Sequence, residues 1–420
     1  MTVPASDHGD RRTVAVVVAV QAAISLGYFS AMAHLVVHLR DDLGLAAGLI
    51  GLVLALRNLV QHTLSLPVGA LVDVLDPVRA GMLACVLRAT GFVLLGTVSA
   101  TPGLVVAALL LGMGGALFHP AAQSLLAGLA DRRRARGYAA YTMTLQAAAV
   151  LGPALGLALL NVGYWLVALV SGGLWLLAAF LFSLLKQAPR LPPGSGAVAG
   201  VRTALRDRIF MWFVVVSMPA MLLANQAAVV VPLGGASAGA VTVFSCVLAM
   251  VSAAVQPWCA PRAERPGVLR AGLLCAGAGY LLLATGAGGG GPGLIAVAVL
   301  HGLAGGLLQP AVFQTVARLA RPSRYGTYLG VRAFFAGLLA FAGGIAVSRA
   351  FESGPRGATT ALAALAALAL LACAAAAATT RRPSATAMIR RRRARPAGDP
   401  LGADRREREL ESAPHAGVAD

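Results

Sequence analysis

Four polar side chains lie close together in a segment that is otherwise apolar. Arg57, Asn58, Gln61 and His62 fall within six residues of the stretch LALRNLVQHTLS. On a helix with about 100° per residue they share an arc of about 140°. An arginine near the centre of a membrane helix costs roughly 2.5–3.5 kcal/mol, so it must face water or a partner. We expect this stripe to line a wet cavity; a helix–helix hydrogen-bond cluster without a ligand is the alternative.

Other apolar segments carry polar residues of the same kinds. Arg332 stands in apolar sequence as Arg57 does, and arginine binds carboxylates through two parallel hydrogen bonds. If both arginines reach one cavity, an anionic or carboxylate-bearing solute is expected. Pairing of each arginine with backbone carbonyls or with a carboxylate at a gate is the alternative. The predicted cavity residues are Gln21, Tyr28, Arg57, Asn58, Gln61, His62, Gln146, Asn225, Gln226, Tyr328 and Arg332.

Histidines are the predicted proton carriers of this chain. A buried carboxylate is the usual carrier in a membrane, but none of the 16 acidic residues falls inside an apolar run. His62, His119 and His301 do, and histidine titrates near neutral pH. A hydrogen-bonded contact between helices is the alternative for each of them.

The composition indicates an integral membrane protein. Of 420 residues, 58% are hydrophobic and 12% are charged, whereas a soluble domain has about 25% charged residues. The net charge of +18 is spread between apolar runs and is accompanied by only 6% aromatic residues, which argues against nucleic-acid binding. The five cysteines form no CxxC motif, and no His/Asp/Glu cluster is present, so no metal, no cofactor and no enzymatic activity is predicted.

The apolar runs predict twelve membrane-spanning helices. A helix needs about 20 residues to cross the hydrocarbon core, and the runs show no alternation with period two. The fold class is therefore an all-α integral membrane protein. The predicted spans are 13–36, 45–72, 80–99, 103–128, 137–160, 163–185, 209–232, 236–258, 268–287, 292–317, 326–348 and 357–378.

The chain repeats itself and alternates in loop charge. The stretch 101–130 aligns without a gap to 291–320, with a proline, a glycine and a second proline at matching places. This repeat predicts two pseudo-symmetric six-helix halves. Arginines are concentrated in every second loop, which by the positive-inside rule places both termini in the cytoplasm. The predicted parts are a cytoplasmic N-terminus (1–12), an N-terminal half (13–185), a linker (186–207), a C-terminal half (208–378) and a basic disordered tail (379–420).

At this point the sequence resembles the major facilitator superfamily, and within it the twelve-helix drug efflux permeases. The stretch GALVDVLDPVR at 69–79 resembles the signature of the loop between the second and third helices. Gly69 and Asp73 match it, and Arg79 is the nearby positive charge. The resemblance implies that Asp73 latches a cytoplasmic gate, with Glu264 at the equivalent position of the second half.

A second motif lies on the fifth predicted span. LGPALG at 151–156 resembles the Gly-Pro-x-x-x-Gly pattern of the family's antiporters. Gly152, Pro153 and Gly156 permit close helix approach and a bend. Pro120 and Pro310 occupy matching places in the two halves and predict further bends.

The sequence therefore predicts a secondary transporter of the bacterial inner membrane. The favoured function is export of a small organic molecule, a drug or a metabolite, by proton antiport and alternating access. One alternative is a facilitator or proton symporter that takes up an organic acid, and a second is a non-transporting membrane sensor. The expected partners are the solute, protons and the lipid bilayer; no nucleic acid is expected, and the chain is expected to be a monomer.

Overall fold

The structure is a computed structural model that describes residues 5–64, 77–127, 131–185, 197–259, 262, 265–288, 290–320 and 325–380. The chain divides into two compact units, 1–376 and 377–420. The elements below belong to the first unit, apart from the last residues of the final helix. The described residues form helices and connecting turns and no strand, which confirms the predicted all-α class.

The N-terminal half contributes the first group of helices. In a bilayer a helix is favoured because it satisfies every backbone hydrogen bond within one segment. The helices are α1 (Ala5–Val37), the short π-helix η1 (His38–Asp42), α2 (Ala47–Thr63), α4 (Pro77–Thr97), α5 (Thr101–Ala127), α6 (Asp131–Leu160) and α7 (Tyr164–Ser183).

The C-terminal half contributes the second group. Its first predicted span is broken at Met218, because Pro219 has no amide hydrogen with which to continue the α9 ladder. Part of the predicted linker forms the short helix α8. The elements are α8 (Ala197–Arg206), α9 (Arg208–Ser217), α10 (Pro219–Leu233), α11 (Ala238–Cys259), α12 (Pro266–Ala284), α13 (Gly291–Leu319), α14 (Tyr325–Glu352) and α15 (Pro355–Thr380).

Eleven helical segments in the described residues are long and apolar enough to cross a membrane. The remaining predicted span, 45–72, corresponds to α2, which has 17 residues before the described chain is interrupted. Every predicted span therefore contains a helix, although the span 45–72 is described only in part.

Each half has its own apolar core. In the N-terminal half Trp175 stacks on Phe92 and meets Phe118 edge-on, and all three side chains are buried. In the C-terminal half Tyr280 and Leu273 lie at the centre of a second cluster. Most of the buried apolar side chains of each half thus pack within that half.

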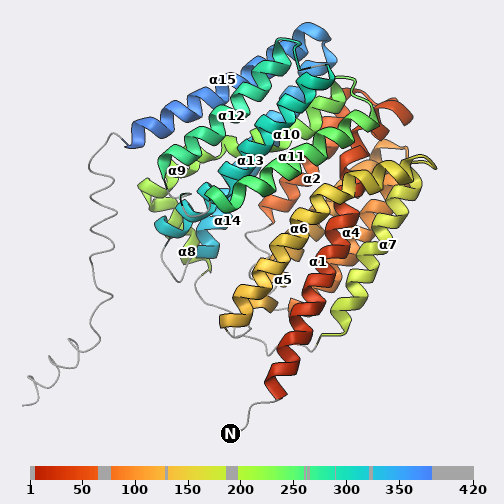
Figure 1. The fold of residues 1–420 in the computed structure, drawn as a ribbon, viewed down its shortest axis with the longest axis vertical. Coiled ribbons are helices and arrows are strands. Elements are labelled where there is room, and N and C mark those ends of the chain that lie inside the picture. Colours follow the sequence, from red (N-terminus) through yellow and green to blue (C-terminus); the bar gives the residue numbers. More distant parts are fainter. Residues whose placement is uncertain are drawn as a thin grey trace, which may run out of the picture. The chain divides into compact units, whose positions relative to one another are not determined.

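Two pairs of helices make the most extensive contacts between the halves. α2 packs against α14, and α6 packs against α11, as Figure 1 shows for α6 and α11. Small residues allow the first approach, because a methyl group added to Gly51 would meet Ser348 and one added to Gly344 would lie 3.6 Å from the Cβ of Ala55.

The halves also meet where α1 ends and α2 begins, which we call the η1 end of the bundle. Arg40 of η1 donates to the backbone carbonyls of Pro232 and Ala236 beside the end of α10. Val37 packs there in a buried cluster with Ala227 and Phe244 of the other half. The η1 end is thus closed by both polar and apolar contacts.

Candidate functional site

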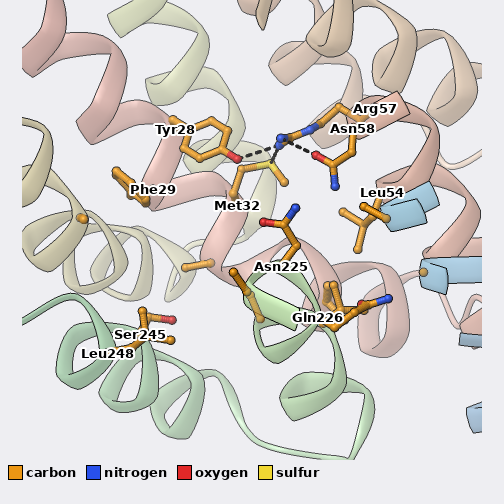
Figure 2. A pocket seen from close by; sticks show the side chains of 18 of the residues that line it. Tyr28, Phe29, Met32, Leu54, Arg57, Asn58, Asn225, Gln226, Ser245 and Leu248 are labelled. Carbon is orange, nitrogen blue, oxygen red and sulfur yellow. Dashed lines mark hydrogen bonds between the residues drawn. The ribbon is translucent and has the colours of Figure 1, made fainter. Parts of the chain in front are cut away.

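A pocket of about 380 Å³ lies between the two halves. Three helices of each half line it: α1, α2 and α6 from the first, and α10, α11 and α14 from the second. These are corresponding helices of the two repeats, so the pocket follows the pseudo-symmetry of the fold. Figure 2 shows it from close by.

Among the described residues that line the pocket, Arg57 alone is charged. Its side chain is only 8% exposed. One terminal nitrogen donates to the Tyr28 hydroxyl at 2.8 Å, and the other donates to Asn58 Oδ1 at 3.0 Å. A weaker contact reaches the Met32 sulfur at 3.7 Å. Arg57 is therefore held at the wall by polar but uncharged groups (Figure 2).

A second buried arginine stands behind this wall. Arg88 of α4 donates to the Leu111 carbonyl at 3.2 Å and to Gln61 Oε1 at 3.0 Å. Its guanidinium also lies 5.4 Å from the Tyr28 ring centroid and 5.0 Å from that of Trp175. Because Arg57 lies 5.3 Å from the same Tyr28 ring, both cations contact one aromatic side chain.

The C-terminal half supplies amide and hydroxyl groups. Asn225 and Gln226 line the pocket from α10, and Ser245 lines it from α11. In Figure 2 the Asn225 side chain points from α10 toward Met32 and the Arg57–Asn58 pair. The polar wall is thus divided between the two halves.

The structure brings together some of the predicted cavity residues and separates others. The following predicted residues line the pocket: Tyr28, Arg57, Asn58, Gln146, Asn225 and Gln226. Gln21 instead donates to Ser25 of its own helix at 2.8 Å, and Gln61 accepts from Arg88. Tyr328 lies against Phe210 and donates to Asp207 at 3.3 Å.

Arg332 is buried but is not part of the pocket lining. Its guanidinium donates to the hydroxyl and the backbone carbonyl of Ser217, both at 3.3 Å. Ser217 is the last residue of α9, where the helical ladder breaks before Pro219. Arg332 therefore satisfies the end of a broken helix, which is the backbone-carbonyl alternative considered for it from the sequence.

The predicted gate motif is only partly described. Gly69, Asp73 and Glu264 lie outside the described residues, and Arg79 is exposed in the first turn of α4. His119 and Pro120 lie within α5, but their side chains are also outside the described part.

The glycines of the antiporter-like motif form the contact between α6 and α1. The helix continues through Pro153. A methyl group added to Gly152 would meet Phe29, and one added to Gly156 would meet Ser30 and His34. The motif thus places the Pro153 carbonyl close to α1.

His34, which sequence reasoning did not select, occupies this contact. Its Nε2 lies 2.9 Å from the Pro153 carbonyl oxygen and 3.5 Å from the Thr242 hydroxyl of α11. The side chain is fully buried and touches both halves. Its position near the end of an apolar run gave no sign of this contact, although the spacing of Gly152 and Gly156 marks the facing surface.

The predicted histidines lie elsewhere. His301 is buried in the C-terminal half, where its Nδ1 is 3.0 Å from the Val297 carbonyl and its ring packs edge-on against Tyr280. His62 lies at the α2–α14 contact, where a methyl group added to Gly337 would meet it. Neither residue lines the pocket.

An all-helical membrane bundle in two halves, with a polar pocket between them, defines a multi-pass membrane transporter. The chain belongs to the Major Facilitator Superfamily, whose family model matches residues 17–344. This match confirms the resemblance noted in the loop and helix motifs.

Named relatives are also transporters. The chain is 30% identical over 322 residues to the multidrug resistance protein MdtH of Aeromonas hydrophila, covering 73% of this chain and 79% of that protein. It is 32% identical over 168 residues to an uncharacterized MFS-type transporter of Mycobacterium tuberculosis. That second match spans 40% of each chain.

Solved structures share the fold at low sequence identity. A mutant form of the peptide transporter POT superposes with a TM-score of 0.75 at 16% identity, covering 91% of this chain and 99% of that one. The nucleoside transporter NupG gives a TM-score of 0.72 at 12% identity, covering 87% and 99%. These likenesses concern the fold alone.

Proposed function

We propose that this chain exports a small organic molecule by proton antiport and alternating access. The observation that carries the proposal is the pocket lined by three helices from each of two separately packed halves. Rocking of the halves around such a pocket exposes it first to one face of the membrane and then to the other.

The contacts at the η1 end support a particular state of this cycle. The arginine-rich loops predict that both termini are cytoplasmic, which puts the η1 end outside. Arg40 and the Val37 cluster join the halves at that end. When the halves are in contact at the outer face, solute can enter the pocket only from the cytoplasm, which is the loading step of an exporter.

The multidrug resistance name of the MdtH relatives favours export. The proton gradient can supply the free energy for this export. One proton moving down 100 mV releases about 2.3 kcal/mol. That free energy supports roughly a 50-fold solute gradient, which is enough to lower the internal concentration of a toxic compound.

We propose His34 as the proton-carrying residue. Binding of a proton to the carrier must change a contact between the two halves. His34 contacts Pro153 of one half and Thr242 of the other. In the neutral ring Nε2 either donates to the Pro153 carbonyl or accepts from Thr242, but it cannot do both. Protonation leaves only the bond to the Pro153 carbonyl and gives Nδ1 a hydrogen, for which the described residues supply no partner. Of the described titratable groups toward the η1 end of α1, His38 is paired with Asp42 at 2.6 Å, and Tyr164 donates to the Ala31 carbonyl.

Uptake of an organic acid remains the second candidate. It is favoured by Arg57, because the described pocket lining contains a cation and no carboxylate. Such a facilitator or symporter would support growth on its solute, whereas an exporter would confer tolerance to it.

Everted membrane vesicles test the proposed function. A pH-gradient dye would be followed while organic cations, neutral drugs and carboxylates are added in turn. Export by antiport predicts that a solute dissipates the gradient, and that Arg57→Ala, present at equal amount, does not respond. No response to any solute with folded protein present would reject proton-coupled export and leave uptake as the working function.

A further inference from the structure

Three buried hydrogen-bond donors in the pocket wall have no partner among the described residues. They are Arg57 Nε, Gln146 Nε2 and Ser348 Oγ. All three residues line the pocket, and they come from α2, α6 and α14. Buried polar atoms in native proteins are normally paired, so these atoms mark unused hydrogen-bonding capacity in the wall. Ser348 Oγ lies at the α2–α14 contact beside Gly51, which leaves Arg57 as the donor that bears on charge.

The chemistry of these atoms defines what that ligand must offer. A guanidinium nitrogen and an amide nitrogen donate and cannot accept, and a serine hydroxyl can donate. The other two nitrogens of Arg57 already bond to Tyr28 and Asn58. A ligand that pairs with this wall therefore offers an acceptor to Arg57.

Charge narrows the choice of acceptor. The described lining carries Arg57 and no acidic residue, and Arg88 adds a second cation against the same Tyr28 ring. The described acidic side chains Asp41, Asp42, Asp207 and Glu352 lie at helix ends instead. Like charges repel strongly where water is scarce, so a cation is disfavoured here and an anion is favoured.

Apolar side chains also make up a large part of the wall. Phe29, Met32, Leu54, Phe244 and Leu248 line the pocket between the polar groups. Such a surface fits a flat or branched hydrocarbon body.

We propose that the pocket binds an amphiphilic carboxylate, with its anionic group at Arg57 and its apolar body against Phe29, Met32 and Phe244. The proposal rests on the transport function above and names the substrate class of the same site. It holds equally for export and for uptake, because it concerns binding alone.

Three probes with one hydrocarbon body test the proposal. Biphenyl-4-carboxylate, biphenyl-4-carboxamide and 4-phenylbenzylammonium would each be titrated into the purified full-length chain in lipid nanodiscs by calorimetry. A hydrogen bond to a charged group predicts that the carboxylate binds about 10- to 100-fold more tightly than the carboxamide. The ammonium probe should bind more weakly than the carboxamide. Equal binding of the three probes, or preference for the ammonium, would overturn the proposal.

Matched arginine variants distinguish binding at Arg57 from a general effect of removing a buried arginine. Arg57→Gln should remove the preference for the carboxylate, while Arg57→Lys should keep part of it because the charge remains. Arg332→Gln is the control, since Arg332 is 9% exposed, close to the 8% of Arg57, but lies against Ser217. Its preference for the carboxylate should be unchanged. A preference that survives in folded Arg57→Gln would also overturn the proposal.

The outcome is independent of the vesicle experiment. Carboxylate preference in nanodiscs without any change of the pH gradient would uphold the substrate class and reject proton-coupled export. Gradient dissipation by cations, together with no carboxylate preference, would support proton-coupled export and reject the proposed substrate class.

Discussion

Arg57 and Arg332 both stand in apolar sequence, but they lie in different surroundings in the structure. Arg57 lines the pocket and has an unpaired nitrogen, whereas Arg332 is bonded to the end of α9. Hydropathy marks both as buried cations, but it does not tell which face of a fully apolar helix meets the cavity. These residues could therefore be predicted as polar exceptions, but which of them line the pocket could not.

At Arg332 we expect a loss of stability without a loss of binding specificity. Arg332→Ala leaves the Ser217 hydroxyl and carbonyl without this donor. An unpaired buried group costs about 1–3 kcal/mol, so the melting temperature in detergent should fall clearly. Thermal melting of the variant, followed by fluorescence, checks this. An unchanged melting temperature would show that Arg332 does not hold the broken helix.

At His34 we expect uncoupling of transport from protons. His34→Gln keeps a polar side chain but cannot be protonated, so solute-driven dissipation of a pH gradient should disappear. Exchange of labelled for unlabelled solute across the membrane needs no net proton movement and should continue.

His301→Gln is the matched control, because His301 is equally buried but bonds within its own helix. It should retain coupling. Lost coupling in His301→Gln with normal coupling in His34→Gln would move the proton-carrying role to His301.

At the scale of helices, sequence periodicity and hydropathy predict the architecture well. Each predicted span contains a helix, and the matching proline and glycine positions of the repeat fit the two halves. The break at Met218 was not predicted, because an apolar run reads as continuous even where Pro219 interrupts its hydrogen bonds. Helix α8 also escaped prediction, since a short helix in a linker is stabilised by packing on α14 and not by its own length.

The close approach of α6 to α1 gives a prediction at this scale. Gly156→Ala would place a methyl group against the Ser30 backbone and His34, and overpacking typically costs about 1–3 kcal/mol. Gly173→Ala on α7 has nothing within 4 Å of the added carbon and should be neutral or slightly stabilising. Melting of the two variants checks the contact. Equal stability would show that α1 and α6 do not require a glycine at this point.

At the scale of the whole transporter unit, the halves are joined at α2–α14, at α6–α11 and at the η1 end, and most of their buried apolar residues pack within one half. Ala55 and Gly344 offer a way to fix this arrangement. A Cβ added to Gly344 would lie 3.6 Å from the Cβ of Ala55, which suits a disulfide bond. The double variant Ala55→Cys/Gly344→Cys should cross-link α2 to α14, and each single variant is a control for the native cysteines.

Transport by the cross-linked protein is the most direct test of alternating access around the pocket. Everted vesicles containing the double variant would be given the solute that dissipates the pH gradient with the unmodified chain. We predict no dissipation after oxidation, full recovery after reduction, and a normal response from both single variants. Undiminished dissipation by fully cross-linked protein would contradict the account, because the solute would then cross without the two halves separating at α2 and α14.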